Sequence, residues 1–135
     1  MKFKQLSLEE YQSITKIPFL EKQRKNGQLP YLEECLQSGT AEYYIINYNN
    51  QQYSFWFYKN GNIADLCLTE KNPKSLFDNE IIIKGIFHFL QSKGYKNITM
   101  TLPKKQYHWA IKYGFKKTKE IKYGTREFIE WEKEL

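Results

Sequence analysis

The sequence predicts an α+β fold with a mixed, mostly antiparallel sheet of about seven strands and helices on both faces. Three segments rich in aromatic and β-branched residues follow one another between short polar turns, which is typical of an antiparallel meander. Helix-like and strand-like segments then alternate, which favours a strand–helix–strand unit. A chain of 135 residues can bury one core of its own, so we expect a single domain over residues 1–135.

The first part of the chain predicts one strand followed by helices. Residues 2–7 have the composition of a short strand, and Ser7 is a suitable cap for the helix after it. Glu10 lies three residues beyond Ser7, so the two side chains can form a capping box. Residues 16–39 predict one or two short helices, interrupted near Asn26-Gly27 and Pro30 and ended by Gly39.

The meander is predicted over residues 41–48, 51–58 and 62–69. Its first turn is rich in asparagine, and its second contains the pair Asn60-Gly61. The second turn is the stronger hairpin signal, because a type I′ turn requires positive φ at both central positions and Asn-Gly tolerates this.

The remaining residues predict two helices and three strands. The helix at residues 74–94 is apolar on most faces, Ile81 included, and is expected to pack against a sheet. Glycines follow both helices and mark where they end. The later elements are a strand at 96–103, a helix at 104–114 and paired strands at 115–124 and 125–135.

Positive charge is concentrated in the second half of the chain. The net charge is +6, yet residues 71–126 alone carry 13 Lys or Arg against 3 Asp or Glu. One interpretation is a solvated lysine surface. The other is an anionic partner, either a phosphorylated cofactor or nucleic acid.

The composition argues against membrane-spanning, disulfide-bonded and metal-binding classes. No apolar run is long enough to span a bilayer, and the first ten residues lack the apolar core of a signal peptide, so a cytoplasmic protein is expected. Cys35 and Cys67 form no disulfide framework, and Cys67 is expected to be a buried free thiol. His88 and His108 are far apart, and no metal-ligand spacing occurs.

The order of the predicted elements, together with the segment WAIKYGFKKTKEI at residues 109–121, resembles the GNAT superfamily of acyl-CoA-dependent N-acyltransferases. The resemblance in element order covers the whole chain, whereas the local motif covers its last third. It implies transfer of an acetyl group from acetyl-CoA, as cosubstrate, to an amine of a small molecule or a protein.

The resemblance also implies which residues hold the cosubstrate. The backbone of the third meander strand would contact the pantetheine arm, and the turn before the next helix would hold the pyrophosphate. In this turn Phe77 and Asn79 occupy the two positions where the family has glycines, so the glycine-rich loop is missing. The residues implied in binding are Leu66, Cys67, Leu68, Thr69, Lys71, Lys74, Ser75 and Tyr107.

Two catalytic roles follow from the same resemblance. The family often has a tyrosine that protonates the departing thiolate, but Ala110 stands at that position. Tyr107 and Tyr113 flank it, one helical turn away on either side, and Tyr113 is the candidate acid, although an aromatic residue before Gly-Phe also suits core packing. Asp65 is the acidic residue of the third meander strand and the candidate general base, although strand alternation also permits an outward-facing residue. Glu33 and Glu34 are alternative bases.

Two other functions compete with acetyl transfer. A catalytically inactive GNAT-like module would use the basic half of the chain to bind nucleic acid or an acidic protein. Aminoacyl transfer from a charged tRNA, which related folds perform, would also account for the missing glycines. The lysines of a nucleic-acid site would be Lys104, Lys105, Lys116, Lys117 and Lys119.

Overall fold

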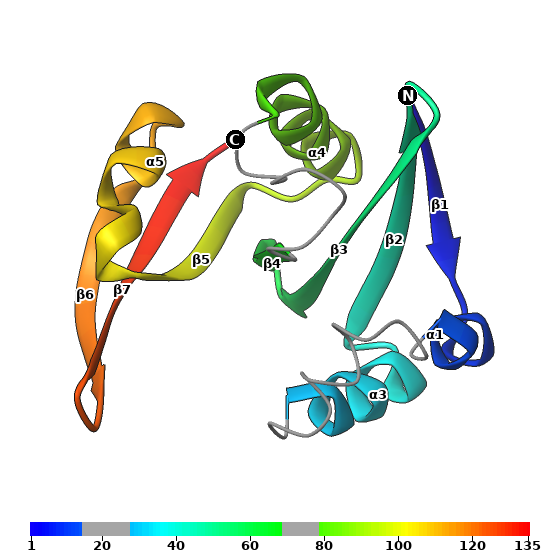
Figure 1. Ribbon diagram of the computed structural model, residues 1–135, viewed down its shortest axis with the longest axis horizontal. Helices are drawn as coiled ribbons and strands as arrows, with labels where there is room; N and C mark the ends of the chain where they lie inside the picture. Colours follow the sequence, from blue (N-terminus) through cyan, green and yellow to red (C-terminus); the bar gives the residue numbers. More distant parts are fainter. Residues whose placement is uncertain (15–27, 69–78) are drawn as a thin grey trace. The chain divides into compact units, whose positions relative to one another are not determined.

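The computed structural model describes residues 1–14, 28–68 and 79–135, which are drawn in colour in Figure 1. Over these residues, seven strands form one sheet in the order β1-β2-β3-β4-β5-β7-β6. The β4–β5 pair is parallel, whereas β1–β2, β2–β3, β5–β7 and β6–β7 are antiparallel. The predicted mixed, mostly antiparallel sheet is therefore confirmed, and with it the α+β class.

The described residues fall into two compact units. The first lies within Met1–Lys59 and Cys67–Asn79, and the second comprises Asn60–Leu66 and Glu80–Leu135. The boundary between them cuts strand β4 after Leu66.

The first unit contains β1 (Lys2–Leu6), β2 (Ala41–Tyr48) and β3 (Gln51–Asn60), visible in Figure 1. Asn49 and Asn50 connect β2 and β3 with φ values of 49° and 61°, so the turn with two positive φ values lies here. Strands β3 and β4 are neighbours in the sheet across the next turn, as predicted, but the type I′ geometry is absent, because Gly61 has positive φ (59°) while Asn60 does not. Asparagine tolerates positive φ better than most residues with a side chain, which accounts for the turn at Asn49 and Asn50.

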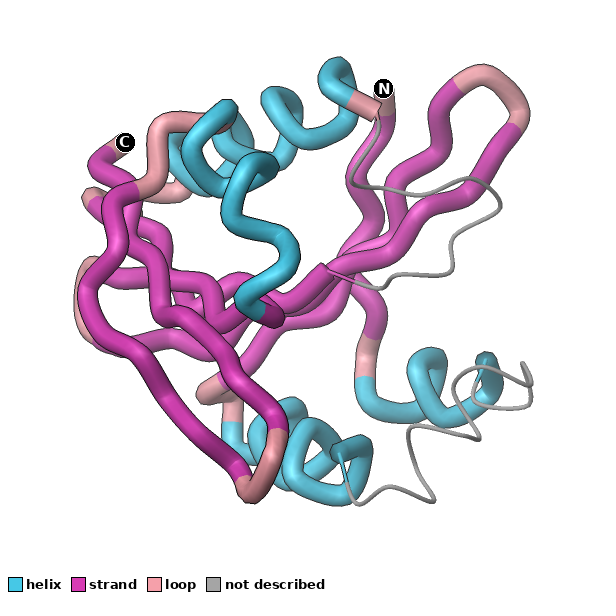
Figure 2. Tube along the Cα trace, turned by 60° about the vertical axis from the view of Figure 1, so that its left-hand side comes forward, coloured by secondary structure: helices cyan, strands magenta, loops and turns pink. Residues whose placement is uncertain are grey.

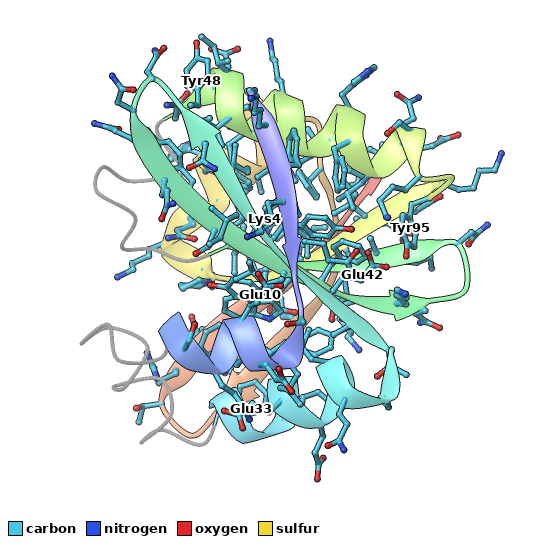
Figure 3. The ribbon with its side chains drawn as sticks, turned by 90° about the vertical axis from the view of Figure 1, so that its right-hand side faces the viewer. Lys4, Glu10, Glu33, Glu42, Tyr48 and Tyr95 are labelled. Atoms are coloured by element: carbon cyan, nitrogen blue, oxygen red, sulfur yellow. The ribbon has the colours of Figure 1, made fainter. Side chains whose placement is uncertain are left out.

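Two helices of this unit begin much as the sequence predicts. In α1 (Leu8–Ile14) the capping box is present: the Ser7 N–H donates to Glu10 Oε1 and the Glu10 N–H donates to Ser7 Oγ, both at 3.1 Å. Lys4 on β1 also pairs with Glu10 at 3.2 Å, and both are labelled in Figure 3. Pro30 lies within the first turn of α3 (Gln28–Ser38) and does not interrupt it, because proline is tolerated there.

The core of the first unit is aromatic. Tyr43 stacks on Trp56 with ring centroids 5.8 Å apart and contacts Tyr11 of α1 at 5.0 Å. All three side chains are buried, as is Leu32 of α3. Cys35 is a buried member of the same cluster, and Cys67 packs against it half-buried. Both cysteines are free thiols, but Cys67 is less buried than expected.

The second unit is built from the end of the meander and the alternating elements that follow. Figure 2 draws its strands in magenta and its helices in cyan. Its elements are the first part of β4 (Ile63–Leu68), α4 (Glu80–Ser92), β5 (Asn97–Pro103), a 3₁₀ turn (Lys104–Gln106), α5 (Tyr107–Lys112), β6 (Lys116–Tyr123) and β7 (Arg126–Glu134).

Helix α4 is shorter than the sequence predicts. It begins at Glu80 rather than near Ser75, and Ile81 is 57% exposed rather than part of the apolar face. Its buried side chains are Ile82, Ile83, Ile86, Phe87 and Leu90, which recur at helical spacing.

A second aromatic cluster packs the middle of α4 against the residues that follow α5. The Phe87 ring lies 6.1 Å from that of Tyr113 and 5.7 Å from that of Phe115. Gly114 has φ of +82°, and a Cβ at this position would lie 3.0 Å from Lys133 Nζ. Lys133 in turn lies over the Phe87 ring at 5.5 Å. The Tyr-Gly-Phe motif therefore requires glycine for its positive φ, whereas a Cβ would only displace the flexible end of the Lys133 side chain.

Candidate active site

The parallel pair at the centre of the sheet holds the candidate base. The β4–β5 ladder pairs Ile63 with Asn97, Ala64 with Ile98 and Asp65 with Thr99. Directly opposite residues point to the same face, and the Thr99 hydroxyl donates to Asp65 Oδ1 at 3.1 Å. Asp65 is thus half-buried at the last pair of the ladder, with one carboxylate oxygen held by a hydroxyl.

The electrostatic environment makes Asp65 a stronger base. Burial, which penalises the charged form, raises the pKa of Asp65, and the negative charge of Glu130 raises it further. The hydrogen bond from Thr99 acts in the opposite direction but does not reverse the shift. A raised carboxyl pKa in a half-buried position is a property of general bases.

Thr99 and Glu130 were not predicted as parts of this site. Thr99 is opposite Glu132 in the β5–β7 register, and Thr101 is opposite Glu130, so these side chains share a face with Asp65. Buried Ile98, Met100 and Leu102 alternate with them on the other face. The alternation of apolar and polar residues in 96–103 could have indicated which side chains share the face of Thr99. Only the register of the strands shows that Asp65 and Glu130 lie on that face too.

The predicted pantetheine-binding residues begin where the ladder ends. Strand β4 continues from Asp65 through Leu66, Cys67 and Leu68, yet its pairing with β5 stops at Asp65. The side chain of Leu66 is buried, and those of Cys67 and Leu68 are half-buried. The next predicted residues, Thr69, Lys71, Lys74 and Ser75, lie outside the described residues, as does Phe77.

The residues that begin α4 carry two local interactions. Asn79, at one of the two glycine positions, donates from its amide to the Tyr53 hydroxyl at 3.4 Å. Glu80 pairs with Lys84 at 2.9 Å, and this pair lowers the pKa of Glu80. A carboxylate in the first turn interacts favourably with the helix dipole and competes there with any bound anion.

The candidate acid lies in the aromatic cluster of the second unit. Tyr113 follows α5 directly, its side chain is 6% exposed, and its hydroxyl oxygen is buried. Its ring lies 4.9 Å from that of Trp109, and the Lys112 amine lies over it at 5.4 Å. Ala110 is fully buried on the same short helix.

Tyr107, the first residue of α5, is the more accessible tyrosine. Its side chain is 45% exposed, and its ring lies 5.9 Å from that of Trp131 and 5.2 Å from that of His108. The alternative bases lie on α3 of the first unit, where Glu33 is half-buried and Glu34 is exposed.

Several lysines of the basic segment form ion pairs on the surface. Lys104 pairs with Glu127 at 3.4 Å, Lys117 with Glu120 at 2.6 Å and Lys119 with Glu130 at 3.6 Å. Three of the five lysines assigned to a nucleic-acid site therefore contact a glutamate of β6 or β7. This arrangement does not favour the nucleic-acid interpretation, because those lysines already have anionic partners.

Comparison with solved structures identifies the fold. N-acetyltransferase PseH of Campylobacter jejuni, solved in complex with acetyl coenzyme A, matches at 15% identity and a TM-score of 0.64, covering 98% of this chain and 99% of that one. An assigned acetyltransferase of the GNAT family from Desulfovibrio desulfuricans matches at 11% identity and a TM-score of 0.65, covering 98% of each chain. The chain has the GNAT fold.

Other GNAT-fold structures match in the same way. A spermidine N-acetyltransferase chimera from Vibrio cholerae has a TM-score of 0.65 at 8% identity, covering 99% of this chain and 96% of that one. No protein-family model matches the sequence, and no curated protein matches it. The GNAT fold is thus reached here with a divergent sequence, as the resemblance in element order predicted.

The described helices and polar clusters also bear on membranes and metals. Within the ranges 1–14, 28–68 and 79–135, no helix is long and apolar enough to cross a membrane. The same residues contain no group of three or more His, Cys, Asp or Glu side chains arranged to hold a metal ion.

Proposed function

We propose that this protein is an N-acetyltransferase that transfers the acetyl group of acetyl-CoA to a primary amine. The observation that carries the proposal is Asp65, a carboxyl with a raised pKa at the last pair of a short parallel ladder. The GNAT fold of solved acetyltransferases, one of them in complex with acetyl-CoA, supports the choice of cosubstrate.

In the proposed reaction the amine nitrogen attacks the thioester carbonyl. Asp65 accepts a proton from the amine, a C–N bond forms, and the C–S bond breaks as the CoA thiolate leaves. Tyr113 is the proposed donor of the proton that the thiolate takes up. The face that carries Asp65 also carries Glu130 and Glu132, and these negative charges favour an acceptor that arrives as an ammonium ion. Asp65 takes its proton from this ion before the attack, which frees the nitrogen lone pair. The second proton, which the nitrogen loses after the attack, replaces the one that Tyr113 gives to the thiolate.

Binding of the cosubstrate is assigned to the residues that follow Asp65. The backbone of Leu66, Cys67 and Leu68, with that of Thr69, is proposed to contact the pantetheine arm, and Tyr107 is proposed as a further binding residue. Lys71, Lys74 and Ser75 are proposed to contact the pyrophosphate ahead of α4. Lysine charge would compensate for the close backbone approach that a glycine-rich loop provides.

Thermal unfolding with and without acetyl-CoA tests the proposal. A ligand that binds only the native state stabilises it by about 2.7 kcal/mol at a hundredfold excess over Kd. We expect acetyl-CoA to raise Tm, and release of free thiol to follow when an amine such as lysine, a peptide N-terminus or a polyamine is added. Absence of stabilisation at millimolar acetyl-CoA would refute the cosubstrate. Stabilisation by acetyl-CoA without thiol release from any amine would leave a binding protein instead.

A further inference from the structure

Two buried polar atoms of the second unit have no hydrogen-bond partner among the described residues. They are the indole Nε1 of Trp131, whose side chain is 2% exposed, and the amide Oε1 of Gln106. Folded proteins satisfy the large majority of such atoms, and each exception requires an explanation. One of these atoms is a donor and the other an acceptor.

Gln106 and Trp131 belong to elements that contact each other. The 3₁₀ turn Lys104–Gln106 contacts β7, the strand that carries Trp131. Tyr107 follows Gln106 directly, and its ring lies 5.9 Å from that of Trp131. Gln106 stands at the N-terminus of α5 but makes no side-chain cap hydrogen bond, so its amide oxygen is not used by the helix.

The surroundings of the pair are otherwise apolar. Trp131 lies opposite Met100 in the β5–β7 register, and Met100 and the neighbouring Leu102 are buried. In such a setting a ligand that satisfies both atoms gains two hydrogen bonds where water competes weakly. Tyr107 packs on Trp131 and is itself 45% exposed, and the subsite proposed below requires its ring to turn aside.

We propose that Trp131 and Gln106 form a subsite for a secondary amide. The indole N–H donates to the carbonyl oxygen of the amide, and Gln106 Oε1 accepts from its N–H, which matches the polarity of the two atoms. On the proposed function the ligand is an amide of the pantetheine arm of CoA, so the inference rests on that function and adds two binding residues to it.

The indole N–H signals of ¹⁵N-labelled protein test the subsite directly. The chain has three tryptophans, and the signal lost in Trp131→Phe identifies the one of interest. We expect CoA to move this signal downfield, whereas adenosine 3′,5′-bisphosphate, which lacks the pantetheine arm and its amides, leaves it in place.

Binding measurements provide the second readout. Trp131→Phe keeps an aromatic ring but removes the N–H, and Gln106→Leu removes the acceptor at similar size. Each should weaken CoA binding roughly fivefold to tenfold, as expected for one lost hydrogen bond, and leave adenosine 3′,5′-bisphosphate unaffected. Trp56→Phe is the matched control, because Trp56 is also a buried tryptophan but belongs to the core of the first unit.

The possible results separate the subsite from the function. If wild type binds CoA but neither the Trp131 signal nor the affinities of the variants change, the pair holds a bridging water only, and the inference fails while the function stands. Equal losses for CoA and adenosine 3′,5′-bisphosphate would indicate a general structural change and would also overturn it. If wild type binds no CoA, both the function and the subsite are refuted.

Discussion

Replacement of Asp65 by asparagine should slow acetyl transfer and, at neutral pH, stabilise the folded protein. The asparagine side chain would retain the size of the original and an oxygen that accepts from Thr99, but it cannot accept a proton from the amine. General bases contribute about 10²- to 10⁴-fold to the rate, so a loss of at least a hundredfold in kcat/KM is expected with little change in acetyl-CoA affinity.

The stability effect follows from the raised pKa of Asp65, which is caused chiefly by burial. A carboxyl whose pKa is higher in the folded than in the unfolded state, here above the reference value of 3.8, binds its proton more tightly when folded. Stability therefore falls as pH rises through the folded-state pKa, and it stays lower above it. Asparagine removes this cost, although it also replaces the charge-assisted hydrogen bond from Thr99 with a neutral one.

Denaturant unfolding of wild type and Asp65→Asn at a series of pH values measures the effect. The advantage of the variant should be largest near neutral pH and should shrink as pH falls towards 3.8, where the wild-type carboxyl is protonated. Glu130→Gln is the matched control: it retains Asp65 but removes a charge that raises its pKa, so the acid limb of the pH–rate profile should move to lower pH. An Asp65→Asn protein that is less stable than wild type at pH 7, or that retains its rate, would refute the reasoning.

Three other perturbations test separate parts of the molecule. Tyr113→Phe removes only a hydroxyl and should lower the single-turnover rate at least tenfold if this group is the acid, with thermal stability retained; an unchanged rate would assign Tyr113 to packing alone. Glu80→Gln removes a negative charge from the first turn of α4 and should tighten CoA binding about twofold at low salt and less at high salt, by calorimetry; weaker binding would contradict a pyrophosphate there. Gly114→Ala should lower the free energy of unfolding by about 1–2 kcal/mol because of the left-handed backbone, and by up to about 1 kcal/mol more because the new Cβ displaces Lys133 from the Phe87 ring. In urea unfolding, the loss should therefore exceed that of Gly94→Ala, whose Cβ would meet nothing within 4 Å. Equal losses in the two variants would exclude an effect of Lys133.

Local interactions allowed the sequence to predict most of the secondary structure. The Ser7–Glu10 capping box, the aromatic meander and the Tyr123-Gly124 turn between β6 and β7 each depend on residues a few positions apart. Periodicity identified the buried residues of α4 for the same reason, with Ile81 the exception, and the order of elements together with residues 109–121 was sufficient to indicate a GNAT fold.

Two local predictions failed where neighbouring structure outweighed the sequence signal. Asn49-Asn50, rather than Asn60-Gly61, has the two positive φ values. Helix α4 begins at Glu80, directly after Asn79, whose side chain donates to Tyr53 of β3. Capping and turn propensities amount to about 1 kcal/mol, which a few tertiary contacts can exceed.

The chemical properties of the site were decided by the tertiary structure alone. Asp65 was a candidate from the sequence, but its hydrogen bond to Thr99 and the influence of Glu130 depend on the register of three strands. A one-residue slip in that register would move each of these side chains to the opposite face. The same holds for Trp131 Nε1 and Gln106 Oε1, which are buried without a hydrogen-bond partner among the described residues. Their burial and their lack of a partner depend on residues that are distant in the chain.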